Sequence, residues 1–230
     1  MDDFATTSSD RTATRHIIWD WNGTLLADND ANLAALNEVC AAFGVERVTL
    51  DHWRGMFRRP LIDCYEELLG TSLSPHKWET VNDIYHTHYI KHLASCGLTD
   101  GAPHVLRGWQ SEGWTQSLLS MAGHDHVRAM IEEWELRSYF TRVDGRRFDT
   151  ERDSKAEHLI HHLRGQEVDP KTAVLIGDID DDARAAAEAG AQAVLVTTGL
   201  MDRERLRRTG FPVVDSIQEA VALVGDRAPS

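Results

Sequence analysis

The chain has 230 residues, of which 42% are hydrophobic and 27% charged, a composition typical of a globular protein and unlike that of disordered or fibrous chains. Its 37 acidic residues outnumber 24 basic ones, and the resulting formal charge of -13 argues against a nucleic-acid-binding surface. No segment approaches the ~20 apolar residues of a membrane span, and residues 1–14 lack the apolar block of a signal peptide. The three cysteines are scattered singly, which favours a reducing compartment. We therefore expect a cytoplasmic protein with a flexible tail over residues 1–14.

The first predicted strand begins at His16 and runs into Asp20, because the run His-Ile-Ile-Trp-Asp is short, apolar and bounded by a loop signal. That signal is Asn22-Gly23-Thr24, so Asp20 lies at the carboxyl end of the strand.

The next stretch, from Asp28 to about Thr99, holds only helical patterns. Apolar residues recur at helical spacing over 33–43, a second helix is expected over 60–70, and a third over 74–95. We interpret this stretch as a helical insert that is long enough to form a separate lid.

After the insert, strands and helices alternate to the end of the chain. Strands are predicted over 115–121, 140–144, 172–177, 191–196 and 212–214, and helices over 124–136, 154–164, 180–189, 203–208 and 217–224. This alternation indicates a parallel sheet that is covered on both faces. The expected fold is a doubly wound, Rossmann-like α/β core over residues 15–27 and 100–230, with an α-helical cap inserted over 28–99.

Polar groups that suit phosphoryl transfer follow the predicted strands. Asp20 ends the first strand, Ser120 the second and Asp178 a later one, while Lys155 opens the helix before the last of these. In an open parallel sheet, ligands bind beyond the carboxyl ends of the strands. A carboxylate nucleophile, a metal-binding carboxylate, a hydroxyl and an ammonium are the groups that attack on a phosphoryl group requires.

These residues also match known motifs. Asp20-Trp-Asn-Gly-Thr-Leu resembles the first motif of the haloacid dehalogenase superfamily, Asp-x-Asp-Gly-Thr-Leu, and departs from it at Asn22. Ser120 and Lys155 resemble the second and third motifs. The segment 177–182, Gly-Asp-Ile-Asp-Asp-Asp before an Ala-rich helix, is similar to the fourth. A helical insert after the first motif is typical of the superfamily's first cap class, which includes phosphoglycolate phosphatases.

The resemblance implies an Mg²⁺-dependent hydrolase of small phosphorylated metabolites, such as phosphoglycolate-like or sugar phosphates. Asp20 would form the aspartyl-phosphate and also ligate the metal. Asp178, Asp182 and the backbone carbonyl of Asn22 would complete the protein ligands.

The remaining site residues would contact the substrate or support the loop. Ser120 and Lys155 would hold the transferring group, and Thr24 would support the loop after the nucleophile. Arg58 and Arg59 lie between two cap helices, where a substrate-recognition loop would face the core, and a guanidinium suits phosphate or carboxylate. Asp180 and Asp181 are interpreted as solvated acids at a helix N-terminus.

Asn22 leaves several interpretations open. The superfamily's second Asp protonates the leaving group and then activates water, which is worth roughly 10²–10⁴-fold in rate, and an amide cannot exchange a proton in this way. Leaving groups that depart easily could make the acid dispensable, or His124 or a cap histidine could replace it. Alternatively, the chain could be a catalytically weak or silent protein that binds Mg²⁺ and an anionic ligand or a protein partner.

Two related activities also lack this acid. Phosphonatases need a cap lysine, and no lysine lies between Asp20 and His76. Dehalogenases have an aromatic residue at this position and need no metal, whereas this chain has the complete fourth motif.

Overall fold

The structure is a computed structural model that describes residues 16–147 and 154–226, so the expected tail over 1–14 lies outside the described residues. Six parallel strands form one sheet in the order β5-β4-β1-β6-β7-β8. Their bounds are β1 His16–Trp19, β4 Thr115–Gly123, β5 Val143–Arg146, β6 Ala173–Gly177, β7 Gln192–Val196 and β8 Val213–Val214. From β1, the strands β4 and β5 extend the sheet to one side, and β6, β7 and β8 extend it to the other. This order confirms the predicted doubly wound fold.

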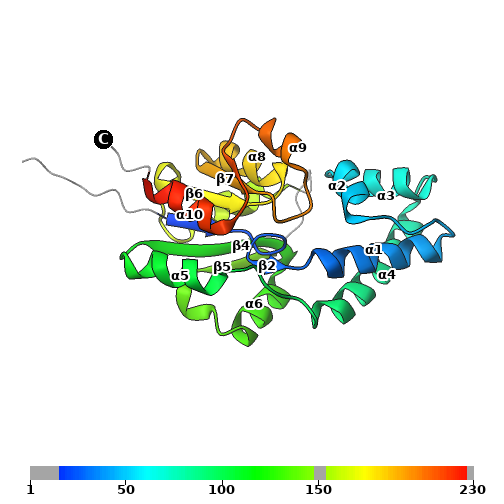
Figure 1. Ribbon diagram of the computed structural model, residues 1–230, viewed down its shortest axis with the longest axis horizontal. Helices are drawn as coiled ribbons and strands as arrows, with labels where there is room; N and C mark the ends of the chain where they lie inside the picture. The colour runs from blue at the N-terminus through cyan, green and yellow to red at the C-terminus, as the bar shows by residue number, and fades with distance from the viewer. Residues whose placement is uncertain (1–15, 148–153, 227–230) are drawn as a thin grey trace, which may run out of the picture.

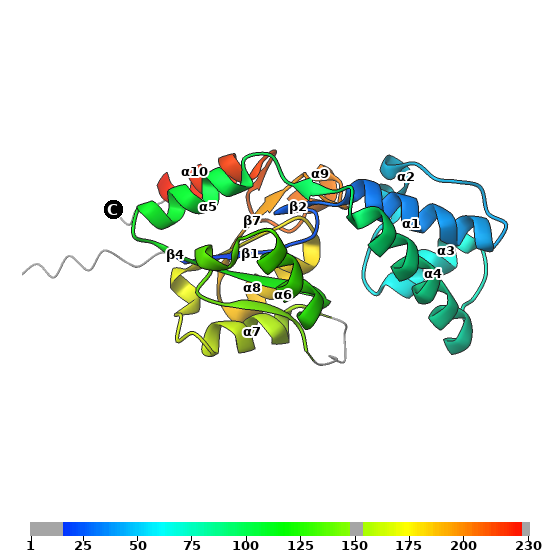
Figure 2. The same cartoon turned by 90° about the horizontal axis from the view of Figure 1, so that it is seen from below.

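Helices cover both faces of the sheet (Figures 1 and 2). Ile17 and Trp19 of β1 belong to the same buried cluster as α5, α6 and α10, and Ile18 belongs to the cluster of α7 and α8. Alternate residues of β1 therefore pack on opposite faces, which explains why the strand is apolar throughout. The helix bounds are α5 Ala102–Ser111, α6 His124–Glu133, α7 Ala156–Arg164, α8 Asp180–Ala189, α9 Arg203–Arg207 and α10 Ile217–Asp226.

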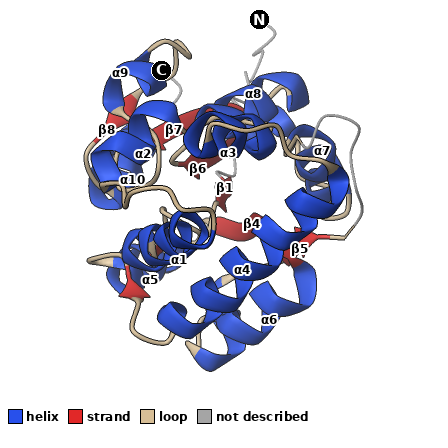
Figure 3. Cartoon of the chain, turned by 90° about the vertical axis from the view of Figure 1, so that its right-hand side faces the viewer, coloured by secondary structure: helices blue, strands red, loops and turns tan. Residues whose placement is uncertain are grey.

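Four of the five described helices between β1 and β4 stand apart from the sheet, and we call them the cap (Figure 1). They are α1 Asn29–Ala42, α2 Leu50–Met56, α3 Leu61–Leu69 and α4 Pro75–Leu93. Seen from the cap side, β1 lies at the centre of the molecule with helices around it (Figure 3). The division at residues 28 and 99 into two separate domains stays a prediction.

The chain enters and leaves the cap through two short strands that pair with each other. Leu26–Ala27 forms β2 and Gly97–Leu98 forms β3, and the two are antiparallel.

Among the described residues, no helix is long and apolar enough to cross a membrane.

Two helices were not expected from the sequence. Helix α5 contains Pro103 and Gly108, which are typical of turns, but its buried face repeats at helical spacing through Ala102, Val105 and Trp109. Helix α2 has only seven residues and includes a glycine, and it begins where the Thr49 side chain accepts a hydrogen bond from His52 N–H at 3.2 Å. Tertiary packing outweighs the turn-forming residues in α5, and in α2 the Thr49 cap acts together with the burial of Trp53.

A buried polar chain predicts how stability depends on pH. His16 Nε2 and His162 Nε2 lie 2.7 and 2.8 Å from the Ser117 hydroxyl, and His162 Nδ1 lies 2.8 Å from Asp144. Burial and then the nearby charge of His162 lower the pKa of His16 from 6.5 to about 4. Below pH 6.5 the unfolded chain therefore binds a proton that the folded chain excludes down to about pH 4.

We expect the free energy of unfolding to fall as the pH drops from 6.5 to 4, with His16 contributing about 2–3 kcal/mol to that loss. Urea unfolding at several pH values in this window measures the slope. The variant His16→Gln should have a shallower slope than the wild type, and parallel curves for the two proteins would contradict this assignment.

Candidate active site

Asp20 follows β1, the strand at which the strand order reverses. Its N–H donates a hydrogen bond to Ile176 O of β6 at 2.9 Å, so its backbone is held against the neighbouring strand. Its side chain is almost fully buried but lines a cavity beneath the cap. This edge of the sheet, at the point where strand order reverses, is where open α/β folds bind ligands.

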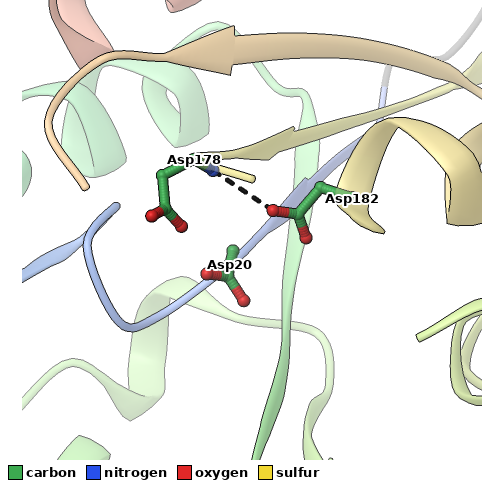
Figure 4. A group of neighbouring side chains, drawn as sticks. All are labelled: Asp20, Asp178 and Asp182. Carbon is green, nitrogen blue, oxygen red and sulfur yellow. Dashed lines mark hydrogen bonds between the residues drawn. The ribbon is translucent and has the colours of Figure 1, made fainter. Parts of the chain in front are cut away.

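Two further carboxylates converge on Asp20 (Figure 4). Asp178 follows β6, and Asp182 lies in the first turn of α8. Asp182 Oδ2 accepts hydrogen bonds from the N–H groups of Asp178 and Ile179, both at 3.2 Å. Oxygen atoms from the three aspartates lie within 4.8 Å of one another, so the cluster can hold a metal ion.

The loop after Asp20 turns back close to this cluster. Gly23 has a φ of +70°, and a Cβ at this position would lie 2.7 Å from Asp178 Oδ2. Only glycine meets both conditions, because other residues rarely adopt this φ and would also collide with the carboxylate. The glycine of the first motif is therefore required by the close approach of its loop to Asp178.

Lys155 supplies positive charge to the cluster. Its buried ammonium bonds to Asp20 Oδ1 and, at 2.7 Å, to Asp182 Oδ1. The backbone N–H of Lys155 donates a hydrogen bond to Asp181 Oδ2 at 3.1 Å, and the Arg184 guanidinium donates one to Oδ1 of the same carboxylate at 2.7 Å. The interpretation of Asp181 as a solvated acid is therefore wrong: this side chain is fully buried and anchors the start of α7.

Negative charge remains in excess in the cluster. Burial raises the pKa of Asp20 to about 7, while the charge of Lys155 lowers it and that of Asp182 raises it. Burial and the charges of Asp20 and Asp182 raise the pKa of Asp178 well above its usual value. Although burial lowers the pKa of Lys155, Asp182 and Asp20 raise it above its ordinary value, so the lysine is a cation. One ammonium among three carboxylates leaves an arrangement that a divalent cation would neutralise.

The spacing of these residues agrees with a known family. The family model of haloacid dehalogenase-like hydrolases matches residues 17–196, most of the chain. The chain belongs to the haloacid dehalogenase-like hydrolases. The family expected from the four motifs is thus confirmed.

Solved structures of similar proteins have the same fold. A predicted phosphatase from Clostridium acetobutylicum is 17% identical, with a TM-score of 0.80 over 93% of this chain and 99% of that one. A haloacid dehalogenase-like family protein from Streptococcus pneumoniae is 20% identical, with a TM-score of 0.78 over 92% and 99%. A predicted phosphoglycolate phosphatase from Haemophilus somnus is 17% identical, with a TM-score of 0.74 over 93% and 99%. Among curated protein sequences, none matches this chain with significance.

Asn22, the departure from the family motif, is held by two partners that sequence reasoning missed. Its Nδ2 group donates hydrogen bonds to Asp28 Oδ2 and to the Tyr89 hydroxyl, both at 2.8 Å. Tyr89 in turn donates to Asp28 Oδ2 at 2.7 Å. Because a carboxylate only accepts hydrogen bonds, the amino group of Asn22 faces Asp28, and both of its N–H bonds are used.

The other predicted site residues fall into two groups. Asn22, Ser120, Lys155 and the three aspartates line the same cavity as Arg59, whose Nε lies 3.8 Å from the Asp181 carboxylate. Thr24 and Arg58 do not line it. Thr24 is fully buried. Arg58 pairs with Glu67 at 2.7 Å, so the placement of Arg58 does not support contact with a substrate.

Proposed function

We propose that this hydrolase is an Mg²⁺-dependent phosphatase that cleaves small phosphate monoesters through an aspartyl-phosphate at Asp20. The observation that carries the proposal is the buried Asp20 carboxylate, held by Lys155 beside two further carboxylates at the floor of a cavity. Similar solved structures that are named as phosphatases support the same reaction class.

The donor set fits Mg²⁺. The three side chains of the cluster offer carboxylate oxygens, which are ligands that this hard cation prefers, and the cluster carries excess negative charge. Asp20, Asp178 and Asp182 would hold the ion together with the backbone carbonyl of Asn22. When bound, the ion would shield the charge between the phosphoryl group and the carboxylates.

The residues of the chain then have defined parts in the reaction. An Asp20 carboxylate oxygen attacks phosphorus, the bond from phosphorus to the leaving oxygen breaks, and that oxygen keeps the electron pair. Lys155 orients the Asp20 carboxylate, and together with Ser120 it would hold the phosphoryl oxygens. Water then attacks the phosphorus of the aspartyl-phosphate, which frees the Asp20 carboxylate and leaves the proton on inorganic phosphate.

Hydrolysis of 4-nitrophenyl phosphate tests the proposal, because its leaving group needs little protonation. We expect turnover with Mg²⁺, a loss to the background rate in excess EDTA, and recovery when Mg²⁺ is restored. Calcium in place of magnesium is the control, since it binds similar oxygen ligands with looser geometry and should support little turnover. Activity that is insensitive to EDTA would contradict the metal-dependent mechanism.

A second candidate function follows from Asn22. Since both N–H bonds of its amide are used on Asp28 and Tyr89, position 22 cannot supply the proton that the family's reaction uses. His124 does not line the cavity, and its Nδ1 accepts the Gly145 N–H at 3.1 Å. The cap residue His86 does line the cavity, so a cap histidine stays a candidate for the proton donor. A silent protein that binds Mg²⁺ and an anion would show a rise in melting temperature with Mg²⁺ and no turnover of 4-nitrophenyl phosphate.

A further inference from the structure

We propose that the leaving group of the substrate is an aromatic ring, so that the phosphate esters this enzyme cleaves are aryl phosphates. This inference rests on the proposed phosphatase function and specifies its substrate class. It starts from the cap side of the cavity, where Asn32, Arg59, Asn82 and His86 lie among a larger set of aromatic side chains that we call the wall. The wall consists of Trp53, Phe57, Tyr65, Trp78, Tyr85 and Tyr89.

The wall is built of rings that hold one another in place. The Tyr65 ring lies 5.6 Å from Trp53 and 5.5 Å from Trp78, both in inclined arrangements, and Tyr85 stacks on Tyr89 at 5.7 Å with an interplanar angle of 9°. Trp78, Tyr85 and Tyr89 are only partly buried, so parts of these rings remain open to a ligand. Such fixed rings bind another ring by offset stacking or by edge-to-face contact.

The hydroxyl groups of Tyr85 and Tyr89 already donate within the protein. Tyr85 donates its hydrogen bond to Asn32, and Tyr89 donates to Asp28 at 2.7 Å. Hydroxyl groups of a sugar that lie against the faces of these rings would lose hydrogen bonds to water, which costs free energy, whereas an apolar ring has no such bonds to lose. Two arginines line the cavity: Arg59 of the cap, which is paired with Asp181 of the core, and Arg146 of β5.

The size and the rim of the cavity agree with a ring. Its volume is about 470 Å³, within the range of roughly 300–1,000 Å³ for pockets that take ligands larger than a two-carbon acid. Ile90 of α4 lines the same cavity and is 58% exposed, the largest exposure of a large apolar side chain among the described residues. This side chain extends the apolar wall toward solvent.

The floor of the cavity points to the same class independently. Asn22 cannot protonate the leaving oxygen, because an amide is far too weak an acid to give up a proton and its N–H groups bond to Asp28 and Tyr89. A phenolate departs without that proton far more readily than an alkoxide, and it takes its proton from water after it has left. Reaction with Asp20 thus yields an aspartyl-phosphate and a phenolate, and water then yields phosphate and restores the carboxylate.

Four substrates separate the effect of an aromatic ring on binding from the effect of how readily the leaving group departs. Acetyl phosphate has a good leaving group and no ring, and cyclohexyl phosphate has a ring-sized group that departs poorly. Phenyl and 2-naphthyl phosphate have leaving groups of similar acidity, but the second ring adds apolar contact. We expect kcat/KM for 2-naphthyl phosphate to exceed that for phenyl phosphate by about tenfold, with cyclohexyl phosphate turned over at the background rate.

The variant Ile90→Ser probes the wall without disturbing the core, since Ile90 is exposed. It should lower the ratio of kcat/KM for 2-naphthyl phosphate to that for acetyl phosphate by about fivefold. Thr87→Ser, an exposed position of the same helix that does not line the cavity, is the matched control and should leave the ratio unchanged. In the wild type, 2-naphthol should inhibit the hydrolysis of acetyl phosphate competitively.

Failure of this inference can be distinguished from failure of the proposed function. Turnover of acetyl phosphate with no preference for 2-naphthyl over phenyl phosphate and no inhibition by 2-naphthol would overturn the aryl assignment and leave the phosphatase in place. An unchanged ratio in Ile90→Ser would also overturn it. If none of the four phosphates is hydrolysed in the presence of Mg²⁺, the phosphatase proposal and the aryl assignment both fail.

Discussion

Replacing Asp20 by Asn is expected to lower kcat for 4-nitrophenyl phosphate on the order of 10⁴-fold or more, because an amide cannot form the aspartyl-phosphate. The two side chains have nearly the same shape, and Lys155 keeps its bond to Asp182 at 2.7 Å, so the fold should be retained. Steady-state kinetics with Mg²⁺ measures the loss, and thermal unfolding checks that the variant is folded.

Asp180→Asn is the matched control for this substitution. Asp180 lies in the same acidic segment, but it faces Arg205 at 4.0 Å and does not line the cavity. The control should keep at least about half of the wild-type turnover, as is usual for substitutions away from a site. An Asp20→Asn protein that remains folded and retains a tenth of the wild-type kcat would refute the covalent mechanism.

Replacing Lys155 by Met is expected to reduce the free energy of unfolding by about 3–5 kcal/mol, the cost of removing one partner of a buried ion pair. The Lys155 side chain is 3% exposed and its ammonium is shared by Asp20 and Asp182, so the variant buries these carboxylates without their cation. Chemical denaturation measures the loss. Turnover should fall as well, since Lys155 orients the nucleophile.

The exposed Lys171 provides the comparison for this variant. Lys171→Met should change stability by less than about 0.5 kcal/mol. Added Mg²⁺ should stabilise Lys155→Met more than the wild type, because a cation in the cluster replaces the missing charge. Equal stability of the two lysine variants would show that the ion pairs of Lys155 with Asp20 and Asp182 do not stabilise the fold.

The sequence predicts the floor of the site well. Asp20, Ser120 and Asp178 each come at or near the end of an apolar strand, and a parallel sheet brings such ends to one edge whatever the length of chain between them. Asp182 is the third residue of α8, which begins two residues after Asp178, so local geometry fixes its position relative to Asp178. The motifs identify these residues because local structure determines where they lie.

The wall of the site is harder to predict. Asp28 looks like an ordinary acid before a helix, and its bond to Tyr89 joins residues 61 positions apart. Arg58 and Arg59 are neighbours in sequence, yet one pairs with Glu67 and the other lines the cavity. The cap helices range from 7 to 19 residues, and the face that each presents to the cavity depends on packing with its neighbours, which no local pattern specifies.

The pairing of β2 with β3 has a consequence for how such enzymes diverge. Because Leu26 lies opposite Leu98 and Ala27 opposite Gly97, the two ends of the inserted segment are adjacent. Loop-closure entropy grows only slowly with the length of chain between two such fixed points, so segments of very different size can be exchanged there. The cap helices can thus be replaced as one module, while β1 and β6, which Asp20 and Asp178 follow, keep their register.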